Sequence, residues 1–416
     1  MDVLPALLGV GYICGVRVAS YLLAGGVTAW FVIMPVIALF GEDAVLYPAT
    51  VPISELGAWG IWSNYIRYIG AGAVAAGGIF SLIKALPLII RTFAQAVRGY
   101  GKNMEEESRT SQDIPIRVVL VGILITAIVM WLIPVIPVNL PGAILIVVLG
   151  FFFATVSSRM VGLVGSSNNP GSGMAMATLI ITAAIYKSSG ATAEGMVSSI
   201  AVGTIICIIA AMAGDTSQDL KTGYLLGATP KKQQIGELIG VLASGLAIGG
   251  VLYLLNAAWG YGGAEVPAPQ ATLMKMIVEG IMGGNLPWNL VFVGVFLALG
   301  LEILRIPVMP FAIGLYLPIY LNATIMIGGV VRMVMDARKN VDEKTKEQQS
   351  TDGTLYCAGM IAGEGLVGIL LAIFAVFGIN TSIGESVNFG NIGGVILMVL
   401  MIASLLYFSL KKKKKA

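Results

Sequence analysis

Apolar runs of about 18–25 residues recur along the chain, and they constrain its fold more than any other feature. A helix needs about 20 apolar residues to cross the hydrocarbon core of a bilayer. Charged residues make up only 11% of the sequence and hydrophobic residues 57%. In a soluble domain, roughly a quarter of all residues are charged, and these cover its surface. We therefore predict an all-α fold, that of a polytopic integral membrane protein.

The apolar runs predict about 12 transmembrane helices, with broken or re-entrant segments among them. Glycine is abundant, at 53 residues, as is typical of membrane helices whose backbones pack closely. The predicted spans cover residues 4–23, 24–40, 66–90, 117–136, 142–164, 173–189, 194–213, 234–256, 287–303, 308–335, 355–377 and 391–409.

Basic residues predict the orientation in the membrane. Segment 91–117 is charged and basic at both ends, segment 335–353 is charged and poor in apolar residues, and the chain ends in a run of lysines. The positive-inside rule places all three, with the C-terminus, in the cytoplasm. The segment 214–234 also favours the cytoplasm, yet an odd number of predicted spans separates it from 335–353. Either residues 274–284 also cross the membrane or the proline-interrupted stretch 305–335 is re-entrant. The start lacks a basic n-region and a cleavage site, so we expect no signal peptide and a place in the inner (plasma) membrane.

Several function classes are excluded by composition. The formal net charge of +3 does not indicate a nucleic-acid partner, and the chain has no histidine. The three cysteines lie far apart in apolar runs, so neither a disulfide framework nor a metal site is predicted. No catalytic triad or phosphate-binding loop is present. We expect no enzyme, no catalytic residue and no cofactor, and any proton transfer must use carboxylates, lysine or tyrosine.

An internal repeat is visible in the sequence. Residues 11–27 match residues 314–330 at an offset of 303, and residues 68–83 match residues 356–371 at an offset of 288. In the first match the shared residues are Gly11 with Gly314, and Gly25, Gly26 and Val27 with Gly328, Gly329 and Val330. Transporters often contain such duplicated halves.

The repeat predicts a division into two parts. Residues 1–113 would be the end of a truncated first transporter repeat, and residues 114–416 a complete second repeat. We therefore expect the chain to be a fragment or truncated product of an internally duplicated transporter.

The stretch GSSNNPGSGM (165–174) interrupts two apolar runs. Asn169 is a good N-cap and Pro170 fits a first helical turn, so a new helix is predicted to begin there. Such a break at membrane depth is tolerated only where it is buried in protein or lines a wet cavity, and a helix N-terminus suits a carboxylate. The alternative is a polar loop at the membrane surface. The candidate substrate-binding residues here are Ser167, Asn168, Asn169, Pro170, Gly171, Ser172 and Gly173.

A second polar stretch, GDTSQDLKTGYLLGATPKKQQ (214–234), is a candidate for gating or proton coupling. Thr216 and Asp219 have the spacing of a capping box, and Thr229 with Pro230 forms a second cap and first-turn pair. The alternative is a capped cytoplasmic loop with solvated charges. The candidate residues are Asp215, Gln218, Asp219 and Lys221.

Two further residues are singled out. Glu364 is a lone carboxylate in a glycine-rich apolar run, where an ionised side chain is costly, so it is a candidate for proton coupling. A helix-packing hydrogen bond from a protonated Glu364 is the alternative. Tyr316 lies between helix-breaking prolines in EILRIPVMPFAIGLYLP (302–318) and is a candidate substrate contact, unless the prolines only kink the helices.

These stretches together resemble the oligopeptide transporter family, specifically its prokaryotic members. The motifs are SSRMVGLVGSSNNPGSGM, GDTSQDLKTGYLLGATPKKQQ, RIPVMPFAIGLYLP and AGMIAGEGLVGILLA. The resemblance implies a duplicated fold and proton-coupled uptake of small peptides or metal chelates. The family's basic-Ile-Pro-Pro element appears here as Arg305-Ile306-Pro307-Val308, with valine in place of the second proline.

The leading hypothesis is a secondary active symporter that uses the proton gradient to import small oligopeptides or metal-chelate complexes. The cargo carboxylate would meet the helix end at Pro170 and the amides of Asn168 and Asn169, and Glu364, Asp215 or Asp219 would carry the proton. The alternatives are a passive channel and an inactive or partner-dependent fragment. The expected partners are the lipid bilayer and the small-molecule cargo, and homo-oligomerisation is left open.

Overall fold

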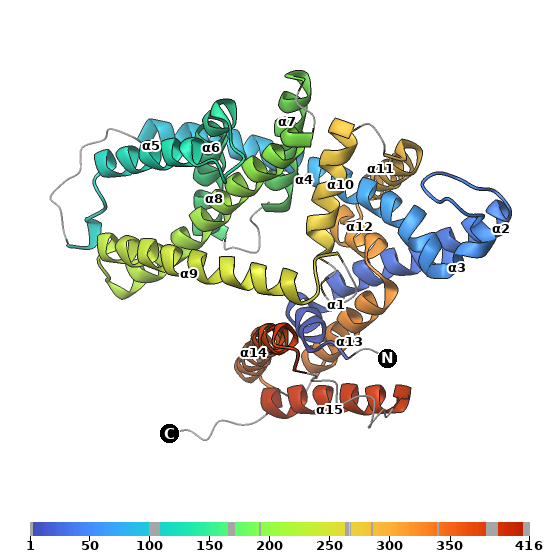
Figure 1. Cartoon of the computed structure of the whole chain (residues 1–416). Coiled ribbons are helices and arrows are strands. Elements are labelled where there is room, and N and C mark those ends of the chain that lie inside the picture. The colour runs from blue at the N-terminus through green and yellow to red at the C-terminus, as the bar shows by residue number, and fades with distance from the viewer. Residues whose placement is uncertain are drawn as a thin grey trace. The chain divides into compact units, whose positions relative to one another are not determined.

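A computed structural model describes residues 3–99, 109–164, 171–190, 193–262, 266, 268–283, 286–338, 341–379 and 390–410. All regular structure in these residues is helical (Figure 1). Within these ranges, eight helical runs are long and apolar enough to cross a membrane. The chain is an all-α polytopic membrane protein, as predicted, although the described residues do not confirm the number of 12 spans.

The chain divides into two compact units, each described here by itself. Unit 1 comprises residues 1–74, 250–267 and 287–416. Its elements are α1 (Pro5–Val27), the π-helical turn η1 (Thr28–Ile33), α2 (Met34–Gly41), α3 (Ile53–Ile61), the π-helical turn η2 (Trp62–Ile66), the start of α4 (Arg67–Gly99), α11 (Trp288–Ile303), α12 (Val308–Tyr316), α13 (Ile319–Asp336), α14 (Glu343–Val376) and α15 (Gly390–Leu410).

Unit 2 comprises residues 75–249 and 268–286. It holds the rest of α4 and most of α9, whose last residues fall in unit 1. Its other elements are η3 (Arg109–Ser111), α5 (Ile116–Leu132), α6 (Leu140–Val164), α7 (Gly171–Ser188), α8 (Ala193–Leu226) and α10 (Pro269–Gly283), and α9 runs over Pro230–Ala258. An apolar cluster that includes Phe153, Met174, Tyr186 and Ile206 joins α6, α7 and α8.

Two boundaries differ from the sequence prediction. The predicted spans 4–23 and 24–40 form one helical run, Pro5–Gly41, which is kinked at Gly15. The expected junction at residues 23 and 24 lies inside α1, and η1 then joins α1 to α2. The segment 214–226, predicted as a loop, is the last part of α8. Its polar side chains find partners on neighbouring helices: Ser217 donates to the Ser158 carbonyl of α6 at 2.6 Å. The expected N-cap Thr216 therefore lies inside a helix.

In unit 1, α1 packs closely on α12 and α13 through glycines (Figure 1). A Cβ atom on Gly11 would collide with the Ile325 backbone of α13, and one on Gly314 would collide with the Leu22 backbone of α1. Only glycine permits such backbone contact, which in membrane helices replaces the hydrophobic effect as a source of packing energy.

The glycine contacts are reciprocal at the predicted offset. Adding 303 to Gly11 gives 314 and subtracting 303 from Ile325 gives 22, and Gly314 does contact Leu22. A second pair, Gly25 against Phe311 and Gly328 against Leu8, obeys the same arithmetic, since 25 + 303 = 328 and 311 − 303 = 8. A two-fold relation between duplicated segments produces such contacts. The compact units cut the chain elsewhere than at residue 113, and the predicted repeat boundaries stay a prediction.

The predicted span 308–335 is broken into α12 and α13 at Leu317 and Pro318. With 9 residues, α12 is about 14 Å long, too short to cross a bilayer core of about 30 Å. The buried Asn322 amide donates to the Gly314 carbonyl at 2.8 Å. This side chain supplies a hydrogen bond where the broken helix cannot, because Pro318 has no N–H.

Candidate functional site

The polar stretch 165–174 lies mostly outside the described residues. Helix α6 ends at Val164 and α7 begins at Gly171, one residue after the predicted start at Pro170. Ser167, Asn168, Asn169 and Pro170 are not described, and neither are the side chains at positions 171–173. Their substrate-binding role stays a prediction.

The carboxylates predicted at 215 and 219 line a recess between α8 and α9. The recess has a volume of about 270 Å³, and its lining includes Asp215, Thr216, Asp219 and Glu237. The Thr216 hydroxyl donates to Glu237 Oε2 at 2.7 Å. The recess therefore brings three carboxylates together on two helices that are long and apolar enough to cross a membrane.

Sequence reasoning missed Glu237. It lies between apolar residues in IGELIGV on α9, so the signal that selected Glu364, a lone carboxylate in an apolar run, applies to it equally. Its Oε1 atom is buried without a hydrogen-bond partner. The carboxylates of Asp219 and Asp215 both act on it electrostatically. A proton held by such a group relieves repulsion between neighbouring carboxylates.

The two other candidates in this stretch, Gln218 and Lys221, do not line the recess. Gln233 of α9 donates to the Asp219 side chain at 3.1 Å and to its carbonyl at 3.2 Å. The Lys221 ammonium lies over the Tyr224 ring at 5.7 Å. Gln218 is exposed, and neither it nor Lys221 lines the recess. The sequence thus located two of the three recess carboxylates.

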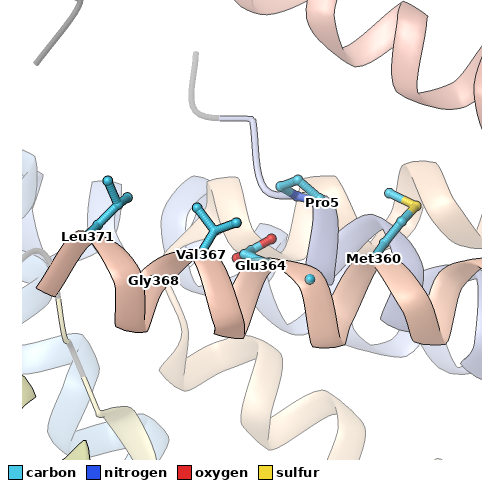
Figure 2. A pocket seen from close by; sticks show the side chains of 7 residues that line it. Pro5, Met360, Glu364, Val367, Gly368 and Leu371 are labelled. Carbon is cyan, nitrogen blue, oxygen red and sulfur yellow. The ribbon is translucent and has the colours of Figure 1, made fainter. Parts of the chain in front are cut away.

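Glu364 lies at the N-terminus of α1 rather than in a carboxylate cluster. Its Oε2 atom accepts a hydrogen bond from the Ala6 backbone N–H at 2.6 Å, so it caps a free N–H of the first turn. Figure 2 shows Glu364 beside Pro5 in a recess of about 400 Å³ on α14, lined otherwise by apolar residues and glycines. Glu364 therefore has a structural contact, and its proton-coupling role stays a prediction.

Tyr316, the predicted substrate contact in unit 1, is buried at the end of α12. Arg67 Nε donates to its hydroxyl oxygen at 3.4 Å. Arg67 is the first residue of α4 and did not stand out in the sequence, because one arginine at the start of an apolar run looks like an interfacial anchor. The contact gives Tyr316 a cationic neighbour.

No group of three or more His, Cys, Asp or Glu side chains that could hold a metal ion occurs within the described ranges.

Comparison with known proteins adds to this geometry. The family model described as OPT oligopeptide transporter protein matches residues 1–375. A Haemophilus influenzae protein whose name refers to oligopeptide transport is 29% identical, over 97% of this chain and 72% of its own length. Two Oryza sativa proteins whose names refer to metal-nicotianamine transport are 26% and 23% identical, over 90% and 91% of this chain. The chain spans only 55% and 57% of the length of these two relatives.

Proposed function

Because the chain belongs to the OPT oligopeptide transporter family, we propose that it works as a proton-coupled symporter for small peptides or metal chelates. The names of its relatives refer to both cargo classes. Symport needs a group that binds and releases a proton during the transport cycle. With no histidine in the chain, a carboxylate is the natural carrier.

The observation that carries the proposal is the recess between α8 and α9. Glu237 has one oxygen bound to Thr216 and the other buried without a donor. Protonation of the second oxygen removes a buried charge and its repulsion with Asp219. Release of the proton restores both, so the relative position of α8 and α9 would depend on the state of Glu237.

The cargo site proposed from the sequence is the helix end at 167–173. In that arrangement a carboxylate of the cargo meets the N-terminus of α7, and the amides of Asn168 and Asn169 add neutral donors. The protein would lie in the inner membrane with the C-terminal lysines in the cytoplasm.

Uptake into proteoliposomes tests the proposal. The purified chain is reconstituted and offered radiolabelled dipeptides or ferric-chelate complexes, with and without an inward proton gradient. We expect uptake that rises with the gradient. Glu237→Gln should reduce this uptake by at least about tenfold, because a positioned proton-transfer group typically contributes more than that. The matched control is Glu343→Gln, whose carboxylate is 92% exposed.

Uptake that persists after an uncoupler collapses the gradient would remove proton coupling. Ionic conductance without cargo accumulation would favour the passive channel. A third outcome is uptake that appears only when the chain is co-expressed with the segments of its longer relatives that it does not match. That outcome would identify a partner-dependent fragment.

A further inference from the structure

Arg67 is partly buried in unit 1 among aromatic side chains. Its guanidinium carbon lies 5.8 Å from the centre of the Trp62 ring, and its Nε donates to the Tyr316 hydroxyl. No carboxylate of the described ranges forms an ion pair with it. A partly desolvated cation in an apolar helical unit is costly unless an anion or water molecules bind to it.

Two further hydrogen-bond donors lie close by. The indole N–H groups of Trp30 and Trp62 are both buried without an acceptor. Trp30 is on η1 and Trp62 on η2, and π-helical turns of this kind occur frequently at functional sites. A buried donor left without an acceptor costs about 1–3 kcal/mol of folding free energy. The two indole N–H groups therefore destabilise the folded protein unless an acceptor binds them.

Trp59 connects the two indoles. Its ring centre is 5.0 Å from that of Trp30 and 5.9 Å from that of Trp62, both edge to face. Trp59 itself is 55% exposed. Trp59 thus lies in contact with both of the rings that carry the unpaired donors.

A second arginine in the same unit shows what a satisfied site looks like. Arg332 lies over the Tyr12 ring at 5.3 Å, much as Arg67 lies over Trp62. Unlike Arg67, it pairs with a carboxylate, Asp336, at 2.8 Å. The two sites share the cation and the aromatic face, and they differ in the anion.

We propose that the Arg67 cluster, defined as Trp30, Trp59, Trp62, Arg67 and Tyr316, binds a carboxylate group of the transported molecule. The donor groups of Arg67 and the two indoles match the acceptor oxygens of a carboxylate, and a guanidinium binds a carboxylate with charge-assisted hydrogen bonds. The proposal rests on the transport function proposed above. For a cargo with one carboxylate, it assigns that carboxylate to this cluster in place of the helix end at 167–173.

Tryptophan fluorescence provides a direct binding test that does not depend on transport. Three of the six tryptophans of the chain lie in the cluster. The detergent-solubilised protein is titrated with the dipeptide Ala-Ala and with its C-terminal amide, which lacks the carboxylate. We expect a saturable fluorescence change with Ala-Ala and an affinity for the amide that is lower by about tenfold or more.

The variants assign the effect to Arg67. Arg67→Gln should remove the preference for the acid, while Arg332→Gln, the matched control, should keep it. In uptake assays Arg67→Gln should raise KM for Ala-Ala by about tenfold and leave the amide unchanged. A preference for the acid that survives in Arg67→Gln would overturn the proposal, and so would equal responses to inorganic phosphate and to the carboxylate.

The two proposals can fail separately. Wild-type protein that discriminates acid from amide in fluorescence, but takes up no cargo in proteoliposomes, would refute the transport function and keep the binding site. Gradient-driven uptake without any discrimination between acid and amide would support the transport function and refute the binding site. If Arg67→Gln does not fold, Arg67→Lys is the second variant. It keeps the positive charge but lacks the two parallel N–H donors of a guanidinium, so its preference for Ala-Ala over the amide should be weaker than that of wild type but still measurable.

Discussion

Helices α1 and α9 have similar glycine-rich sequences and opposite surroundings. The glycines of α1 at positions 11 and 25 touch the backbones of α13 and α12. The glycines of α9, at positions 236, 240, 245, 249 and 250, have no neighbour within 4 Å among the described residues. Glycine content therefore indicates that a membrane helix can pack closely, and it does not identify the packed face.

What holds α9 is a set of polar contacts at its N-terminal end. Thr216 donates to Glu237, and Gln234 bonds the backbone N–H of Ile114 and the side chain of Asp113, both at 3.0 Å. Arg109 donates to the Thr229 hydroxyl at 3.1 Å just before the helix begins. One helix is fixed by steric fit along its length and the other by hydrogen bonds at one end.

The largest effect should come from adding volume to the α1 contact. Gly11→Leu or Gly314→Leu drives a side chain into a backbone, so the helices must separate, at a cost above about 3 kcal/mol. We expect loss of the monodisperse peak in fluorescence-detected size-exclusion chromatography. Gly240→Leu on α9 is the control and should elute like wild type; an equal loss there would mean that both helices are packed by their glycines.

Removing the polar contacts of α9 should give the next effect. Thr216→Val removes the hydroxyl that donates to Glu237 and keeps the carboxylate, so it should free the start of α9 at a cost of about 1 kcal/mol for one hydrogen bond. Hydrogen exchange in 230–240 should become faster, with exchange in α1 unchanged. Faster exchange in α1 as well would show that the two helices are not independent.

A smaller effect is expected from Gln234→Ala. This side chain bonds two groups of the 109–114 segment, but it lies at the exposed side of the contact. The expected loss is about 0.5–1 kcal/mol. Exchange at Ile114 reports it directly, and protection of that amide in the variant would contradict the assignment.

The smallest effect concerns a cap. Asp342 accepts a hydrogen bond from the Thr345 N–H at 3.2 Å at the start of α14. The hydrogen bonds from Thr345 hold the pKa of Asp342 below its ordinary value of 3.8. The ionised cap therefore stabilises α14 fully above that pH, and the contribution disappears as the pH falls through the lowered pKa.

Asp342→Asn tests this cap because it mimics the protonated state. The melting temperature of wild type should exceed that of the variant at neutral pH by no more than about 2 °C. The difference should begin to shrink below pH 3.8 and should vanish once the pH has fallen through the lowered pKa of Asp342. A constant difference across the whole range would mean that the charge of Asp342 plays no part.

The fold class and most helices follow from the sequence because long apolar runs have few alternatives. The exact ends of the helices do not follow from the sequence, since they depend on contacts with residues that are far away in the chain. Residues 214–226 look like a loop by composition, and only contacts such as Ser217 with Ser158 make them helical. Arg67 was missed for the same reason, because only the fold brings Trp62 and Tyr316 to it. Glu237 was missed although it shows the same sequence signal as Glu364, a lone carboxylate in an apolar run.

The reciprocal contacts between α1 and the α12–α13 pair also have a mechanical consequence. Gly11 with Ile325 and Gly314 with Leu22 are two copies of one joint, as are Gly25 with Phe311 and Gly328 with Leu8. Positions 8 and 11 of α1 contact α13, and positions 22 and 25 contact α12, with the kink at Gly15 between them. Because α12 and α13 are also separated by the break at Pro318, the two halves of the joint can move separately, each as a small rigid contact.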